Sequence, residues 1–382
     1  MRVEVKPELI LWACERSGRS IDSLVQQQAF RKLPAWVSGE ANPTFRQLEN
    51  FAKVTRTPFG YFFLHQPPKE SVPIPDLRTI GNEHIEHPSP DLLDTMYICQ
   101  QRQEWYQDFA RSMGERPLPF VGSVTLESNP VDVSRSIRKV LGFDVEERRS
   151  IPTWTEALRR FISQADSIGI MVMVSGIVGS NTHRSLNPNE FRGFALADPL
   201  APLIFINGKD TKAAQMFTLA HELAHIWIGQ TALSDVGPVT IPSNNIEVWC
   251  NQVAAEILVP LGVLHDTYRG DIPLREELDH LARRFKVSTL VILRRLHDAG
   301  KLSREELWRA YEQELKRLRS LSRGSGGNFY LTLPARVSKR FARSLVISTL
   351  EGQTLHRDAF RLLGFSKLAT FHELSRQLGV AI

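Results

Sequence analysis

The sequence predicts a mostly helical α+β protein with one small β-sheet. Apolar residues recur at helical spacing through most of the chain. Only three short apolar runs are typical of strands, and they lie close together at 169–174, 191–196 and 203–206. A long apolar helix, predicted over 210–229, follows them. The expected fold is therefore a small sheet packed on a central apolar helix, flanked by further helical modules.

Composition excludes several classes of protein. The chain has 382 residues, of which 42% are hydrophobic and 23% charged, so it is neither disordered nor of low complexity. Its three cysteines are far apart, which excludes a disulfide framework and a Cys-rich zinc finger and fits a reducing compartment. The longest uncharged stretch is too short to span a membrane, and the first residues lack the pattern of a signal peptide. We expect a soluble cytoplasmic protein.

Proline- and glycine-rich segments divide the chain. Four prolines fall within 66–75, and the run Gly-Ser-Gly-Gly occupies 324–327. The predicted units are a helix-turn-helix-like domain at 1–66, a helical connector at 67–150, a core at 151–270, a second helix-turn-helix-like domain at 271–323 and a C-terminal helical module at 324–382.

The sharpest motif is His221-Glu222-Leu223-Ala224-His225. Histidines at i and i+4 share one helix face, so both imidazoles can reach one metal ion. Glu222 is about 100° further around the helix, beside the metal, where a general base for a metal-bound water belongs. The surrounding residues are apolar, and buried histidines and glutamates are unfavourable unless something satisfies them. The motif therefore indicates a catalytic zinc site rather than two core histidines.

A catalytic zinc ion has three protein ligands and one open position, so a third ligand is needed. The next predicted helix, 244–259, contains Glu247 and Glu256, about 180° apart, so at most one can face the metal. Glu247 shares its face with small and apolar residues, whereas Glu256 shares a more peripheral face with Trp249 and Gln252. We expect Glu247 to be the ligand; the alternative is a capping role at the start of its helix. Weaker substitutes are Glu256, Asp235, Asp266 and His265.

The runs IFINGKDTKAAQMFTLAHELAHIWIG (204–229), EVWCN (247–251) and AAEILVP (254–260) resemble the ImmA/IrrE family of zinc metallopeptidases. The resemblance covers about residues 150–300. It implies a zincin-type, gluzincin-like core in which His221, His225 and Glu247 bind Zn²⁺ and Glu222 is the catalytic base. It also implies a protein substrate, an XRE-type transcriptional repressor, whose cleavage relieves repression in a stress response or in the control of mobile elements or toxin–antitoxin systems.

The sequence says less about where the substrate binds and which group stabilises the oxyanion. We expect the substrate to bind as an extended strand along the edge of the sheet near 191–197, through main-chain hydrogen bonds. The candidates for stabilising the oxyanion are Arg192, His183 and Tyr268, and the sequence does not choose between them.

The run 34–63 (PAWVSGEANPTFRQLENFAKVTRTPFGYFF) resembles the XRE-type helix-turn-helix domain. A DNA-reading helix should present Arg, Lys, Asn or Gln to base edges, while Phe30 and Leu33 are expected in the core. Few cations flank this region, so DNA binding and docking of a protein partner are equally open. The candidates for DNA contact are Gln27, Gln28, Arg31 and Lys32, with Gln26 beside them.

The C-terminal third is basic, with 21 Lys and Arg against 12 Asp and Glu in residues 271–382. The run 278–300 resembles the middle helical domain of the same peptidase family. Its cations can form a nucleic-acid footprint or lie on a solvated face of helices packed on the core, and we favour packing. These cations are Arg283, Arg284, Lys286, Arg294 and Arg295. Residues 324–382 resemble a small helical domain of longer family members.

A second hypothesis comes from a different class. The protein can be a DNA-binding transcriptional regulator or toxin–antitoxin component whose zinc site is structural or sensory. A Glu222→Gln variant separates the two, because only a peptidase needs that carboxylate. The sequence leaves the oligomeric state open.

Overall fold

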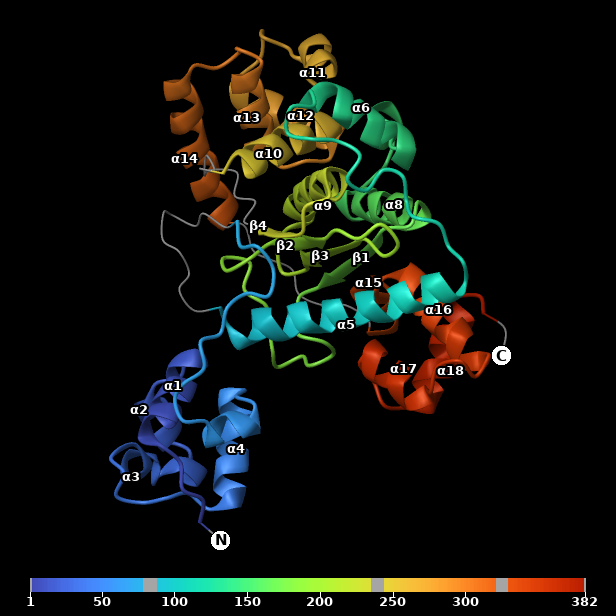
Figure 1. The fold of residues 1–382 in the computed structure, drawn as a ribbon. Helices are drawn as coiled ribbons and strands as arrows, with labels where there is room; N and C mark the ends of the chain where they lie inside the picture. The colour runs from blue at the N-terminus through green and yellow to red at the C-terminus, as the bar shows by residue number, and fades with distance from the viewer. Residues whose placement is uncertain (1, 78–87, 235–243, 321–328, 381–382) are drawn as a thin grey trace. The chain divides into compact units, whose positions relative to one another are not determined.

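The computed structural model describes residues 2–77, 88–234, 244–320 and 329–380 (Figure 1). By its internal contacts the chain divides into two compact units. The first comprises residues 1–73 and 85–96, and the second comprises residues 74–84 and 97–382.

The first unit is a small helical bundle around an aromatic core. Phe51 lies at its centre and contacts Phe30, Trp36 and Phe62 at ring-centroid distances of 5.8, 6.2 and 5.7 Å. Phe30 and Leu33 are buried, as predicted. Its helices are α1 (Pro7–Arg16), α2 (Ile21–Val25), η1 (Gln28–Phe30), α3 (Leu33–Val37), α4 (Phe45–Thr55) and η2 (Phe59–Phe63).

The second unit is built on a four-stranded mixed sheet with the order β1-β3-β2-β4. β1 is parallel to β3, and β2 is antiparallel to both β3 and β4. The three predicted strands are therefore confirmed, and β4 was not predicted because its three residues are too few to show alternation. The strands are β1 (Met171–Ser175), β2 (Gly193–Leu196), β3 (Leu203–Asn207) and β4 (Ala232–Ser234).

The expectation that 191–197 form the exposed edge of the sheet is wrong. After the central helix the chain turns back, and β4 pairs with β2 through Gly193↔Ser234 and Ala195↔Ala232. A further segment then covers β4, because Asp76 forms a parallel bridge with Leu233. β2 is thus an inner strand, and its backbone groups are already paired on both sides.

Helices cover both faces of this sheet (Figure 1). On one face, α8 (Trp154–Ser167) and α9 (Lys212–Ile228) pack on the strands, and α10 (Asn245–Leu258) packs on α9. On the other face, α15 (Phe329–Val337) packs on β1, together with α16 (Lys339–Leu350). The remaining helices are α5 (Pro90–Ser112), α6 (Pro130–Leu141), α7 (Val145–Arg149), α11 (Leu261–Thr267), α12 (Leu274–Phe285), α13 (Thr289–Asp298), α14 (Arg304–Ser320), α17 (His356–Leu363) and α18 (Leu368–Gln377).

Three arginines from different helices meet at the C-terminal end of α10. The last carbonyls of a helix have no partner within the helix and carry partial negative charge. Arg138 donates to the carbonyl oxygen of Glu256, and Arg148 donates to that of Leu258. Arg295 of α13 donates to the carbonyl oxygen of Val259 at 3.0 Å. The end of α10 is therefore held by α6, α7 and α13 together.

α13 is packed into the core rather than presented to solvent. Most of its residues are buried, including Arg295, whose guanidinium forms an ion pair with Glu256. A helix buried in this way cannot enter a DNA groove, which favours the packing interpretation of residues 278–300.

No single helix among the described residues has the length and apolar character needed to cross a membrane. One bent pair, α10 with α11, passes by length and composition alone, and α10 is largely buried within the protein.

The buried ion pair gives a testable prediction. Arg295→Ala should lower the free energy of unfolding by about 3–5 kcal/mol, because it leaves the Glu256 carboxylate buried without its counter-charge. Adding Glu256→Gln should recover part of the loss. Arg294→Ala, on the exposed side of the same helix, should change stability by less than ~1 kcal/mol. Urea denaturation measures all three, and equal losses at positions 294 and 295 would contradict this account of α13.

Candidate metal centre

α9 carries the histidines into the interior of the protein. Thr211 caps its first turn by accepting a hydrogen bond from the Ala214 N–H at 3.2 Å. Gly229 ends it with a φ of +72°, a backbone conformation that glycine adopts without strain. His221, Glu222 and His225 all lie on this helix and are 0% exposed.

α10 brings the third ligand to them. Asn244 caps this helix by accepting a hydrogen bond from the Ile246 N–H at 2.8 Å. The Glu247 carboxylate, 1% exposed, lies 3.2 Å from His221 Nε2 and 3.1 Å from His225 Nε2. Glu247 is therefore engaged with the histidines, and Asn244 alone supplies the cap.

The geometry of these three residues fits a metal ion. Two imidazole nitrogens lie 3.1 Å apart and face one carboxylate at 3.1–3.2 Å. Ligand atoms held tetrahedrally at about 2.0–2.1 Å from one ion lie about 3.3 Å apart, close to what is seen. His221 Nδ1 bonds to the Asn251 Oδ1 at 3.0 Å. An amide oxygen accepts, so Nδ1 carries the hydrogen and Nε2 presents its lone pair to the cluster. Three lone pairs thus converge on one point, which a cation satisfies.

The charge states of the ligands suit metal binding. Burial raises the pKa of Glu247, but its close electrostatic contacts with His221 and His225 outweigh burial and lower that pKa to about 2. Burial lowers the pKa of His225. At neutral pH Glu247 is therefore an anion and His225 a neutral imidazole, the forms in which these side chains bind metals.

Glu222 lies beside the cluster and is not part of it. Both of its carboxylate oxygens are buried, and among the described residues only the Ser234 hydroxyl acts on them, as a long and weak hydrogen-bond donor. Burial and the negative charge of Glu247 raise its pKa well above the usual value, and the hydrogen bond from Ser234 only partly opposes this. A Cβ atom on Gly193 would lie 3.2 Å from Glu222 Oε1 and 2.8 Å from the Phe205 carbonyl oxygen, so only glycine lets β2 pass this closely. The carboxylate is left available to handle a proton.

Two residues of the site were missed by sequence reasoning. Asn251, which orients His221, is four residues after Glu247 and so shares its helix face; that spacing was a usable signal. Ser234 Oγ lies 3.3 Å from His225 Nε2 and 3.4 Å from the Glu247 Oε1. No signal pointed to Ser234, because β4 itself was not predicted.

The weaker candidates for the third ligand lie elsewhere. Glu256 is buried and forms an ion pair with Arg295, and Trp249 is buried too. The expectation that this face of α10 is peripheral is therefore wrong for Glu256 and Trp249. The side chains of His265 and Asp266 are 70% and 85% exposed. Asp235 lies outside the described residues.

The candidates for oxyanion stabilisation are scattered. Arg192 forms an ion pair with Asp210 at 3.5 Å. Tyr268 lies under the ammonium of Lys301, 5.6 Å from it, and His183 is exposed in a loop. The identity of the stabilising group stays a prediction.

The candidates for DNA contact are exposed in the first unit, but not on one long helix. α2 ends at Val25, so these residues fall in and around the short turn η1. DNA binding by them stays a prediction. They are Gln26, Gln27, Gln28, Arg31 and Lys32.

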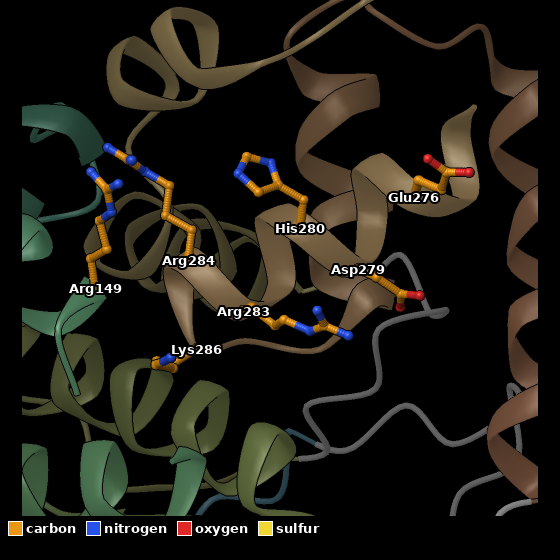
Figure 2. Close-up of a pocket in the computed structure, with 7 residues that line it drawn as sticks. All are labelled: Arg149, Glu276, Asp279, His280, Arg283, Arg284 and Lys286. Atoms are coloured by element: carbon orange, nitrogen blue, oxygen red, sulfur yellow. The ribbon is translucent and has the colours of Figure 1, made fainter. Parts of the chain in front are cut away.

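Part of the basic cluster of 278–300 lines a separate pocket of about 530 Å³ on α12 (Figure 2). Arg284 is paired with Glu146 at 2.7 Å, and Lys286 lies 5.5 Å from the ring centre of Trp154. Carboxylates line the same pocket, so its charge is mixed. The lining residues are Arg149, Glu276, Asp279, His280, Arg283, Arg284 and Lys286.

Comparison with known families agrees with the site. Residues 165–297 match the IrrE N-terminal-like domain of the M78 peptidases. Residues 337–377 match a domain of unknown function. A search of curated proteins found no match to the chain. The peptidase match spans β1 to α13 and contains all three residues of the metal cluster.

The hydrogen bond to His221 predicts a graded effect on metal affinity. Asn251→Ala should weaken binding of a divalent metal about 10–100-fold, because the His221 ring loses the group that orients it. His225→Ala should abolish binding, and Gln252→Ala, at the exposed neighbouring position, should leave it unchanged. Competition with a chromophoric chelator measures each affinity. Wild-type affinity in Asn251→Ala would remove the orienting role.

Proposed function

Because residues 165–297 form a metallopeptidase domain, we propose that this protein is a zinc-dependent endopeptidase that cleaves a peptide bond in another protein. The observation that carries the proposal is Glu222. Its carboxylate is buried beside the metal cluster and has no close hydrogen-bond partner in the described chain beyond a weak contact with Ser234, an unfavourable arrangement that a general base explains.

The donor set supports zinc. Two imidazole nitrogens and one carboxylate oxygen, His221, His225 and Glu247, are a ligand combination of catalytic zinc sites, which keep a fourth position for water or substrate. When bound, a zinc ion supplies Lewis acidity, which lowers the pKa of water and polarises a carbonyl group.

The chain's own residues then handle the protons. Glu222 accepts a proton from the water molecule that attacks the scissile carbonyl carbon, and it delivers that proton to the nitrogen of the departing amine. Asn251 keeps His221 in one ring orientation throughout.

We also propose that the substrate is an XRE-type transcriptional repressor, met in the cytoplasm, and that its cleavage relieves repression. Support comes from the resemblance of residues 204–260 to the ImmA/IrrE peptidases. The region 34–63, itself similar to XRE-type domains, gives the chain a module that can bring it to DNA or to a repressor.

One observation favours a second candidate function, a regulator with a structural or sensory zinc ion. The three ligands are at most 1% exposed, and structural zinc sites are closed in this way. Under that alternative Glu222 has no role, and the burial of its carboxylate without a close hydrogen-bond partner among the described residues is unexplained.

The carboxylate of Glu222 therefore provides the test. Glu222→Gln should bind zinc as the wild type does and hydrolyse the substrate about 10²–10⁴-fold more slowly, because the amide cannot accept the proton. Glu312→Gln, an exposed change in α14, should leave the rate unchanged. Zinc content and the rate of cleavage of a protein captured by the Glu222→Gln variant are the measurements. Equal rates in the two variants would favour the regulator.

A further inference from the structure

The edge of the sheet next to the metal cluster is occupied by the chain itself. Leu233 of β4 donates its backbone N–H to the Pro75 carbonyl oxygen at 2.9 Å and accepts from the Leu77 N–H at 3.0 Å. These two bonds form the parallel bridge between Asp76 and Leu233. The outward backbone groups of Leu233 are therefore both used by residues 75–77.

This edge lies next to a residue that contacts the metal ligands. Ser234 follows Leu233, and its hydroxyl oxygen is 3.3 Å from His225 Nε2 and 3.4 Å from Glu247 Oε1. A peptide bound along β4 at Leu233 would thus run directly beside the cluster. β2 cannot serve instead, because β3 and β4 pair with it on both sides.

Extended peptides bind to proteins by adding a strand to an open sheet edge, with main-chain hydrogen bonds as the common contact. The N–H and C=O of Leu233 can serve only one such strand at a time. An incoming peptide and residues 75–77 therefore compete for the same two groups.

We propose that residues 74–77 are a cis strand that occupies the peptide-binding edge of β4, and that an extended segment of the protein substrate takes its place. The inference rests on the peptidase function proposed above. It identifies the surface that receives the substrate.

The backbone pairing of the cis strand with β4 is short. Pro75 has no N–H to donate, so the backbone hydrogen bonds to Leu233 come from the Pro75 carbonyl and the Leu77 N–H, and the side chain of Ile74 is buried. Prolines at 73 and 75 favour an extended backbone without strengthening the pairing.

The test measures binding, so it does not depend on cleavage. Fluorescein-labelled casein, an unfolded protein, is titrated with zinc-loaded Glu222→Gln protein and followed by anisotropy. Adding Leu77→Pro removes one hydrogen bond of the cis strand and should tighten casein binding about five- to tenfold. Val72→Pro places the same residue in the same linker outside the pairing and should leave binding unchanged. Ile74→Ser, which loosens the strand without a proline, should also tighten binding if Leu77→Pro disturbs folding.

Hydrogen exchange on the Glu222→Gln protein provides the second readout. Saturating casein should speed exchange at the Leu77 amide while the Leu233 amide stays protected, because a new strand replaces the old one. The inference would be overturned if neither Leu77→Pro nor Ile74→Ser changed casein binding, or if no variant bound casein. It would also be overturned if bound casein left Leu77 exchange unchanged.

Failure of the proposed function gives a different result. If casein displaced the cis strand but the wild-type zinc protein did not cleave it, the peptide-binding edge would be supported and the proposed hydrolytic function would be wrong.

Discussion

The convergence of three lone pairs in a dry interior is the constraint on which this structure depends. His221 and His225 on α9 and Glu247 on α10 point their donor atoms at one another within 3.2 Å. Without a cation such an arrangement is strongly unfavourable in a region of low dielectric. The packing of α9 on α10, the caps at Thr211 and Asn244, and the glycine at 193 all serve to hold it.

The site combines two kinds of polar group in one apolar environment. The ligands are anchored, since His221 bonds to Asn251 and Glu247 contacts both imidazoles. Glu222 has only a weak contact with Ser234 in the described chain, and burial makes its proton affinity high. This contrast between fixed ligands and a weakly held carboxylate distinguishes a reactive centre from a purely structural one.

Local patterns predicted the central elements well. The i, i+4 histidines, the apolar helix around them and the choice of Glu247 over Glu256 follow from helical geometry, and the structure brings these residues together. Features set by long-range pairing were out of reach. β4 has three residues, and residues 75–77 reach it from more than 150 positions away in sequence. The inner position of β2, the role of Ser234 and the ion pair of Glu256 with Arg295 depend on such contacts and left no local signal.

The arginines at the end of α10 connect this helix to parts of the chain that are distant in sequence. Because Arg138, Arg148 and Arg295 hold its last carbonyls from before and after the metal site, the support of Glu247 extends through α13. A fragment cut at the predicted boundary of residue 270 would leave the buried Glu256 carboxylate without its ion-pair partner Arg295. The smallest autonomous enzyme thus has to include the helices beyond that boundary, and homologues shortened there would need another cation in place of Arg295.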